Sequence, residues 1–418
     1  MTSAPPSPIL AVDFGTSNSA CAMLHDGAII RLPIEANADT LPTAVFFPDD
    51  RSEMLIGQEA SEALIEGDEG RYMRALKSVL GTSLFHEVQL LGGKRRSLSQ
   101  VVAEFLSVVK ARAEARAGHT FEHVLSGRPV HFHTNDPERD LQAERDLRSC
   151  YRQAGFKQIS FLVEPEAAAL AAHGLNKSGQ IGLIVDIGGG TSDFSVFRGD
   201  GMQVEILANH GIRLGGTDFD HAVSMDHAMP MLGLGGELKR TLGDGLLPVP
   251  KAIYVELSSW AKIPFAYTRE TARTADDMLR HAVEPIKMQR LKRVIEDRLG
   301  HELAFAVEAG KIAANGAAHA PAHIKMGFIE PKLSVPITPG TLNASLAKLR
   351  EPLRQAIYET LTQAQVTPAD IGTVILVGGS SLMKMIADEA QLICPGAALE
   401  RSEAFTAVVD GLALATAR

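Results

Sequence analysis

The stretch Asp186-Ile187-Gly188-Gly189-Gly190-Thr191-Ser192-Asp193 separates an apolar run that begins at Leu183 from another that begins at Phe194. Two apolar runs on either side of a glycine-rich turn predict two strands joined by a hairpin. Glycine, serine and threonine at a hairpin tip leave backbone N–H groups accessible, so a polyphosphate can approach the main chain closely. The stretch therefore predicts a phosphate-binding loop.

A second copy of this pattern lies near the start of the chain. The apolar run from Ile9 to Val12 leads into Asp13-Phe14-Gly15-Thr16-Ser17-Asn18, and apolar residues resume at Ala20. Each copy continues through a turn into another apolar segment, which indicates a duplicated three-stranded meander. An aspartate at the end of each first strand can hold Mg²⁺ through water beside a phosphate. One such loop could be an ordinary tight hairpin, whereas two loops in matched contexts favour a nucleotide clamped from both sides.

Strands and helical segments alternate through the rest of the chain, as they do in α/β proteins. The alternation of Val130 and Phe132 with polar residues, for example, predicts a strand. We expect a disordered N-terminus (residues 1–8), a first lobe (9–178) and a second lobe (179–399) with a mostly helical inserted subdomain at about 222–310. We also expect a C-terminal helix within residues 400–418 to pack back on the first lobe.

Composition and local motifs exclude several other classes. A formal net charge of -9 at pH 7 argues against a nucleic-acid partner, because binding phosphate backbones requires concentrated Lys and Arg. The chain has neither a Walker phosphate loop nor a Gly-x-Gly-x-x-Gly turn that opens a helix. The first residues do not resemble a signal peptide, and no apolar run reaches transmembrane length, so we expect a cytoplasmic protein without a membrane partner.

Taken together, these motifs resemble the nucleotide-binding domain of the seventy-kilodalton heat-shock chaperones (DnaK-like), and within that family the YegD-like ATPase branch. The resemblance covers nearly the whole chain. It implies the actin-like ATPase (ribonuclease H-like) fold, in which two duplicated lobes enclose a cleft. Six segments in the family's order carry it: Asp13 to Thr16, Gly127 to Val130, Glu164 to Ala169, Asp186 to Asp193, Gly215 to Asp220, and Val377 to Ser380.

The resemblance also implies roles for individual residues, with ATP or ADP and Mg²⁺ as cofactors. Asp13 and Asp186 would order the Mg²⁺ through water, and Asp193 and Glu164 would act with them on the attacking water. Glu164 could instead cap the alanine-rich helix that follows it. The expected nucleotide contacts are Gly15, Thr16, Ser17, Asn18, Gly188, Gly189, Gly190, Thr191, Gly215, Gly216, Thr217, Glu308, Lys311, Gly378, Gly379 and Ser380. The spacing of Glu308 and Lys311 is equally that of an ordinary surface ion pair.

The sequence departs from the family at several positions. Aligning on Ile56-Gly57 places Ser61 where the family has its catalytic lysine, and a serine cannot supply the positive charge that stabilises a transferring phosphoryl group. Lys77 or Arg74 is the available substitute. Three further departures affect the predicted adenine and phosphate contacts: Leu382 for an arginine, Ile312 after Lys311, and Thr217 for a glutamate.

The leading hypothesis is a slow Mg²⁺-dependent ATPase of chaperone type, with an unidentified protein as a further expected partner. Because the sequence ends at Arg418, we expect no peptide-binding domain. One alternative is a sugar or acyl kinase on the same fold. Another is a nucleotide-sensing pseudo-ATPase or an actin-like structural protein, which a serine at position 61 would favour.

Overall fold

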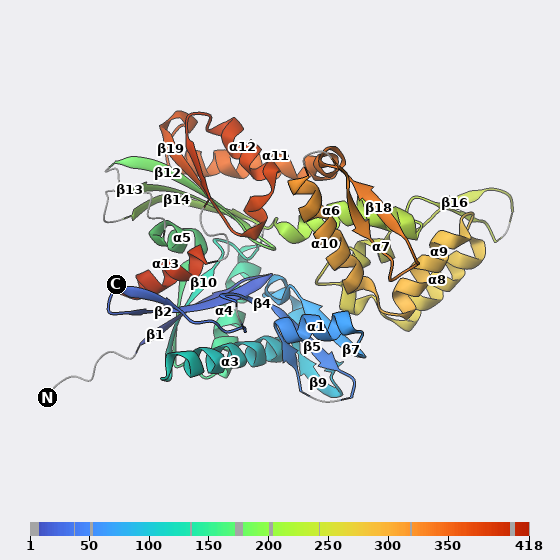
Figure 1. Cartoon of the computed structure of the whole chain (residues 1–418), viewed down its shortest axis with the longest axis horizontal. Helices are drawn as coiled ribbons and strands as arrows, with labels where there is room; N and C mark the ends of the chain where they lie inside the picture. Colours follow the sequence, from blue (N-terminus) through green and yellow to red (C-terminus); the bar gives the residue numbers. More distant parts are fainter. Residues whose placement is uncertain are drawn as a thin grey trace. The chain divides into compact units, whose positions relative to one another are not determined.

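The computed structural model describes residues 8–36, 38–50, 53–133, 136–171, 179–199, 204–241, 243–317, 320–401 and 406–417 (Figure 1). The chain forms two compact units. The first comprises residues 1–216 and 352–418, and the second comprises residues 217–351. The predicted disorder of residues 1–7 and the predicted lobe boundary at residue 178 lie outside the described residues.

A six-stranded sheet near the N-terminus contains the first predicted meander. β1 (Ile9–Phe14) pairs antiparallel with β2 (Asn18–His25), which pairs with β3 (Ala28–Arg31). On its other side β1 pairs parallel with β10 (His123–Arg128), which pairs parallel with β11 (Gln158–Val163). The short strand β4 (Leu41–Pro42) pairs with the start of β2.

A five-stranded sheet repeats this arrangement. β12 (Gln180–Ile187) pairs antiparallel with β13 (Ser192–Gly199), and β13 pairs with β14 (Val204–Ile212). Beyond β12, parallel pairing continues through β19 (Ile371–Val377) to β20 (Ala398–Arg401). In both sheets a meander is followed by two parallel strands, so the predicted duplication and α/β class are confirmed.

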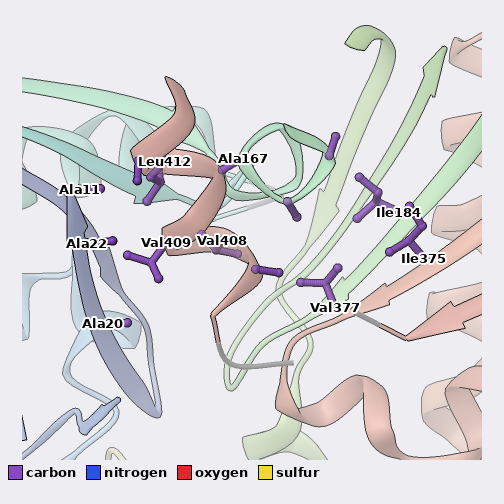
Figure 2. Close-up of a cluster of buried hydrophobic side chains, with 14 of the residues drawn as sticks. Ala11, Ala20, Ala22, Ala167, Ile184, Ile375, Val377, Val408, Val409 and Leu412 are labelled. Atoms are coloured by element: carbon purple, nitrogen blue, oxygen red, sulfur yellow. The ribbon is translucent and has the colours of Figure 1, made fainter. Parts of the chain in front are cut away.

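Two helices with small side chains lie between these sheets (Figure 2). α13 (Ala407–Ala415) contacts α5 (Glu164–Ala171) and the first sheet, and α5 also contacts β12 to β14. The contact is close, because a Cβ at Gly411 would lie 1.6 Å from the carbonyl oxygen of Ala167. The buried cluster that joins the two sheets includes Ala11, Ala20, Ala22, Ala167, Ile184, Ile375, Val377, Val408, Val409 and Leu412.

Further elements of the first unit surround the first sheet. A small sheet contains β5 (Ala44–Pro48) between β6 (Leu55–Ile56) and β7 (Gly70–Arg74), with α1 (Gln58–Glu66) against it. The 3₁₀ helix η1 (Leu76–Val79) and α2 (Ser83–His86) follow β7. The other elements of this unit include the hairpin of β8 (Val88–Leu91) and β9 (Lys94–Ser97), the packed helices α3 (Leu98–Ala117) and α4 (Pro137–Gln153), and α12 (Lys384–Ile393).

The second unit is mostly helical. Its helices include α7 (Ala252–Leu257), α8 (Arg269–His281), α9 (Pro285–Glu296) and α10 (Gly300–Gly316). Two hairpins accompany them, β15 (Glu237–Lys239) with β16 (Leu246–Pro248), and β17 (Ala322–Lys325) with β18 (Ser334–Ile337). α6 (Gly216–Val223) begins at the end of the first unit, and α11 (Pro339–Gln363) runs back into it. Within the described ranges, none of the helices combines the length and the apolar character needed to span a bilayer.

The strand predicted at Val130 and Phe132 is wrong. The nearest strand, β10, ends at Arg128, and residues 129–133 have no strand pairing. The backbone N–H of Phe132 instead donates to the Asp140 carboxylate at the start of α4. A side chain thus provides the hydrogen bond that a neighbouring strand would otherwise supply.

Candidate functional site

Both predicted phosphate loops fold as hairpin tips with the same internal hydrogen bond. In the first, the Gly15 backbone N–H donates to the Asn18 carbonyl at 3.1 Å. In the second, the Gly188 N–H donates to the Thr191 carbonyl at 2.9 Å. Each glycine lies two residues after its aspartate, Asp13 or Asp186, so the duplication extends from the sheets to the loops.

The two loops lie directly against each other within the first unit. A Cβ at Gly189 would come within 2.5 Å of the Ser17 hydroxyl oxygen and 3.0 Å of the Thr16 Cβ. A Cβ at Gly190 would lie 3.3 Å from the Thr16 hydroxyl oxygen. Glycine is therefore required at position 189 because the facing loop occupies the space of a side chain.

Three other predicted glycines support the second loop. The Gly216 N–H donates to the Gly188 carbonyl at 2.9 Å, and a Cβ at Gly215 would lie 2.7 Å from the Gly190 nitrogen. Gly378 follows β19 with φ 81°, and a Cβ there would lie 2.6 Å from Oδ1 of Asp186. The next turn, η6 (Gly379–Leu382), brings Ser380 against Gly216, where an added Cβ would lie 2.2 Å from the serine hydroxyl. The structure thus gathers these residues around the second hairpin.

Four carboxyl groups and one ammonium group share the interior of this site. Asp186 and Asp193 are cross-strand partners on β12 and β13, and Asp13 is the second-last residue of β1, the corresponding strand of the first sheet. Glu164, the first residue of α5, forms an ion pair with Lys77, with 2.6 Å between Oε1 and Nζ. Both side chains of this pair are largely buried, at 11% and 6% exposed. One lysine cannot neutralise four ionised carboxylates, so the site carries an excess of negative charge.

Burial and, to a smaller extent, the neighbouring carboxylates raise the pKa values of the acids in this site. Burial raises the pKa of Asp13 to about 7, with the Glu164 carboxylate adding to the effect and Lys77 opposing it. Burial and Glu164 also raise the pKa of Asp193 to about 7, against hydrogen bonds from the Val130 N–H and the Thr191 side chain. The pKa of Asp186 rises well above its usual value because of burial and its neighbouring carboxylates.

The charge balance suits a divalent cation held indirectly. In the part of the chain that the structure describes, no group of three His, Cys, Asp or Glu side chains converges closely enough to ligate a metal ion directly. Mg²⁺ commonly keeps several of its waters and binds through one or two carboxylates together with phosphate oxygens. Asp13 and Asp186, each at the base of a phosphate loop, fit that mode of binding.

The lysine of the site is Lys77, one of the two residues expected to substitute for the family's lysine, and it does not stand at position 61 as the alignment on Ile56-Gly57 had placed it. Ser61 lies in α1, where its hydroxyl is 3.4 Å from both the Gly57 carbonyl oxygen and the Tyr72 hydroxyl. The alignment on Ile56-Gly57 failed because β7 and a tight turn at Ala75, with φ 60°, intervene before Lys77. A signal was present in the sequence, since Lys77 stands among the apolar residues Leu76, Val79 and Leu80.

The position of Glu164 agrees with both of the roles that the sequence left open, as a helix cap and as a member of the group of acids. It opens α5, where a carboxylate interacts favourably with the helix dipole. Its side chain, however, is bonded to Lys77, and its charge contributes to the raised pKa of Asp13, Asp186 and Asp193. The carboxylate therefore belongs electrostatically to the cluster of acids.

The remaining predicted contacts, Thr217, Glu308 and Lys311, lie in the second unit. Lys311 on α10 is buried and forms an ion pair with Asp220, with 2.6 Å between Nζ and Oδ1. The other oxygen of Asp220 accepts a hydrogen bond from Trp260 Nε1 at 3.0 Å. That Thr217, Glu308 and Lys311 contact the nucleotide stays a prediction.

The two residues expected to alter adenine binding, Leu382 and Ile312, are 41% and 60% exposed.

Comparison with known proteins agrees with this geometry. The family described as "Hsp70 protein" matches residues 9–233, more than half of the chain. The chain is similar to the chaperone protein DnaK of Endomicrobium trichonymphae, with 28% identity over 387 residues that cover 90% of this chain and 52% of the relative. It is also 28% identical to the chaperone protein DnaK of Thermosipho melanesiensis, over 90% of this chain and 54% of that relative. The chain thus spans about half the length of these curated relatives. On this evidence the chain belongs to the Hsp70 family, whose nucleotide-binding domain has the actin-like ATPase fold.

Proposed function

We propose that this protein binds ATP with Mg²⁺ and hydrolyses it slowly to ADP and phosphate. The observation that carries the proposal is the convergence of two matching hairpin loops on a buried group of four carboxyls and one lysine. Backbone N–H groups in such loops can bind phosphate oxygens, and the excess negative charge calls for a cation. Membership of the Hsp70 family, whose members bind ATP and ADP with Mg²⁺, supports the same assignment.

The residues of the site divide into three roles in this proposal. The loops at residues 15–18 and 188–191 bind the phosphates, and Asp13 and Asp186 hold Mg²⁺ through its waters. The cation, when bound, neutralises charge on the phosphate oxygens. Asp193, whose pKa is raised to about 7, accepts the proton of the attacking water, since a carboxyl with such a pKa accepts protons well at neutral pH. Glu164 is the alternative acceptor.

Lys77 supplies the positive charge that stabilises the transferring phosphoryl group. We expect Lys77→Ala to lower the rate of phosphate release by about 100-fold or more, the usual size of effect for one electrostatic donor. The same substitution at exposed Lys94 is the control and should leave the rate unchanged. Both rates would be measured with ATP labelled on the γ-phosphate, after melting curves have established that each variant is folded.

The fate of the label separates ATP hydrolysis from the kinase alternative. Free phosphate supports hydrolysis, whereas label that appears on an added sugar or on acetate would overturn it. No phosphate release by the wild type would support the pseudo-ATPase alternative. The original reason for that alternative has gone, because Lys77 rather than Ser61 faces the acids.

Wider aspects of the function are proposals of the same kind. We propose a cytoplasmic protein that couples nucleotide binding to an unidentified protein partner, and we retain the YegD-like branch and the two lobes divided at residue 178 as predictions. Copurification of the full chain in ATP and in ADP would test for such a partner. A partner that binds equally in both nucleotides would contradict the coupling.

A further inference from the structure

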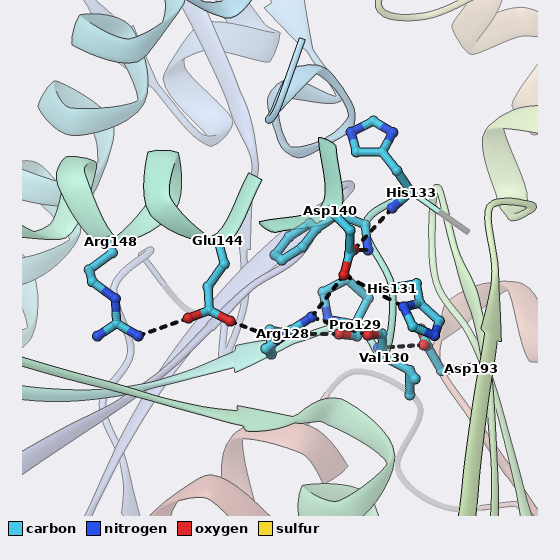
Figure 3. A network of polar contacts seen from close by, with 10 residues as sticks. Arg128, Pro129, Val130, His131, His133, Asp140, Glu144, Arg148 and Asp193 are labelled. Atoms are coloured by element: carbon cyan, nitrogen blue, oxygen red, sulfur yellow. Dashed lines mark hydrogen bonds and ion pairs between the residues drawn. The ribbon is translucent and has the colours of Figure 1, made fainter. Parts of the chain in front are cut away.

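Residues 128–133, here called loop 128–133, comprise the last residue of β10 and the five residues after it, and they contact two parts of the candidate site (Figure 3). Figure 3 shows Asp140 and Glu144 of α4 directed toward this loop, and Asp193 on its other side. The loop contains none of the residues expected to bind nucleotide. The loop matters because it contacts Asp193, the turn that contains Lys77, and Asp140 of α4.

Near its middle the loop makes a hydrogen bond to Asp193. The Val130 backbone N–H donates to Oδ1 of Asp193 at 2.7 Å. The carboxylate has little room to move, because a Cβ at Gly211 would lie 2.6 Å from the same oxygen and 3.1 Å from the Val130 Cβ. A short bond from a charged acceptor to a backbone donor is among the stronger hydrogen bonds. The position of Val130 therefore sets the position of Asp193.

At its last residue, His133, the loop contacts the turn that contains Lys77. Nε2 of buried His133 lies 2.7 Å from the Leu80 carbonyl, and its Nδ1 lies 3.2 Å from Nη1 of Arg213. Since arginine can only donate, Nδ1 is the acceptor and Nε2–H donates to Leu80. Arg213 also donates to the Ser78 carbonyl at 3.1 Å. The carbonyl groups of Ser78 and Leu80, shortly after Lys77 in the chain, are thus fixed by hydrogen bonds from Arg213 and His133.

Along most of its length the loop is anchored by Asp140. Its Oδ1 accepts hydrogen bonds from the backbone N–H groups of Phe132 at 2.6 Å and His133 at 3.2 Å. Its Oδ2 lies 3.5 Å from Nδ1 of His131 and 3.7 Å from Nη2 of Arg128. The Asp140 side chain is only 14% exposed, so its oxygens interact with the loop more than with solvent. Glu144, one turn later on α4, holds Arg128 through a second ion pair of 2.6 Å.

We propose that Asp140 is a positioning residue which, by anchoring loop 128–133, sets the places of both the Asp193 carboxylate and the Lys77 ammonium group. The two groups come from different parts of the fold, β13 and η1. The loop bonds directly to Asp193 through Val130, and it bonds through His133 to Leu80, three residues after Lys77. This inference rests on the proposed ATPase activity for its kinetic consequence, whereas its structural consequence is independent of any activity.

The test compares three substitutions on the first turn of α4 in the full chain. Asp140→Ala removes both acceptors, and Asp140→Asn keeps one oxygen that can accept from Phe132 and His133. Glu138→Ala is the matched control, because it removes an exposed carboxylate from the same helical turn. We expect Asp140→Ala to lower kcat by about 10- to 100-fold, since small displacements of reacting groups have effects of this size, while KM for ATP changes by less than about twofold. Asp140→Asn should recover most of the lost kcat.

Amide exchange provides a readout that does not require turnover. In Asp140→Ala the Val130 amide should exchange at least about ten times faster than in wild type or Glu138→Ala, because its loop is no longer anchored. Unchanged exchange and unchanged kcat would overturn the inference, as would an equal rise in KM and fall in kcat/KM. If the wild type releases no phosphate, the proposed function fails, and the exchange rates alone then decide the inference.

Discussion

At the scale of single residues, the site contains acids whose charge opposes folding. The pKa of Asp13 is raised to about 7 in the folded protein, mainly by burial, from an ordinary value of 3.8. Between these two values the folded state keeps a proton that the unfolded state has lost. The stability of the ligand-free protein should therefore fall as the pH rises from about 4 to about 7.

Asp13→Asn removes this penalty while keeping the shape of the side chain. The gain in unfolding free energy should be small at pH 4.5, increase to at least about 1 kcal/mol by pH 7, and then level off. Urea unfolding at several pH values, without Mg²⁺ or nucleotide, measures the gain. Asp244→Asn, at an exposed position, should show no such trend. A gain that shrinks with rising pH would mean that the Asp13 carboxylate is stabilised rather than penalised.

The same scale shows what the sequence could and could not predict. The aspartates and glycines of both loops follow directly from local patterns, because a hairpin tip is specified by adjacent residues. Lys77 could be named only as one of two candidates, with Arg74, because the choice between them depends on how a strand and a turn carry the chain from Ile56-Gly57 back toward Glu164. The role of Asp140 could not be predicted from the residues around it, since its partners are backbone N–H groups of a loop that the sequence pattern predicted to be a strand.

At the scale of elements, the contact between α5 and α13 joins the two large sheets. The helices approach so closely at Gly411 that an added methyl group would overlap the Ala167 carbonyl. The sequence predicted both helices, because each is a continuous run of small and apolar residues. It predicted that the C-terminal helix packs on the first lobe, but not that its partner there is α5, since the two helices are far apart in the sequence and only tertiary packing brings them together.

Gly411→Ala should therefore be costly even though alanine is the better helix former. We expect a loss of about 3 kcal/mol or more in unfolding free energy, the size typical of an overpacked core that cannot relax. Gly316→Ala is the control, because an added Cβ at the end of α10 meets no atom within 4 Å. Denaturant unfolding of both variants makes the comparison. Equal stability of the two would show that α5 and α13 can separate freely.

At the scale of the whole molecule, the first unit contains both phosphate loops, although they come from two different sheets. Their neighbours, α5 and α13, are the helices that pack between those sheets. A ligand that contacts both loops must then stabilise the packing of one sheet against the other. The sequence predicted the duplicated meanders and the packing of a C-terminal helix on the first lobe, but it did not predict that all of residues 352–418 belong to the same compact unit as residues 1–216.

Binding of Mg²⁺-nucleotide should accordingly require both loops at once. At a free concentration of 100 times Kd, a ligand specific for the folded state adds about 2.7 kcal/mol to its stability, and this should appear as a higher melting temperature. Removing Mg²⁺ with a chelator should abolish most of the shift, because the excess charge of the acids then repels the phosphates. Asp13→Asn and Asp186→Asn should each reduce the shift, although they alter different sheets. If one of the two variants kept the full shift in ATP and in ADP, the nucleotide would be bound by a single hairpin, and the duplicated loop would serve only the fold.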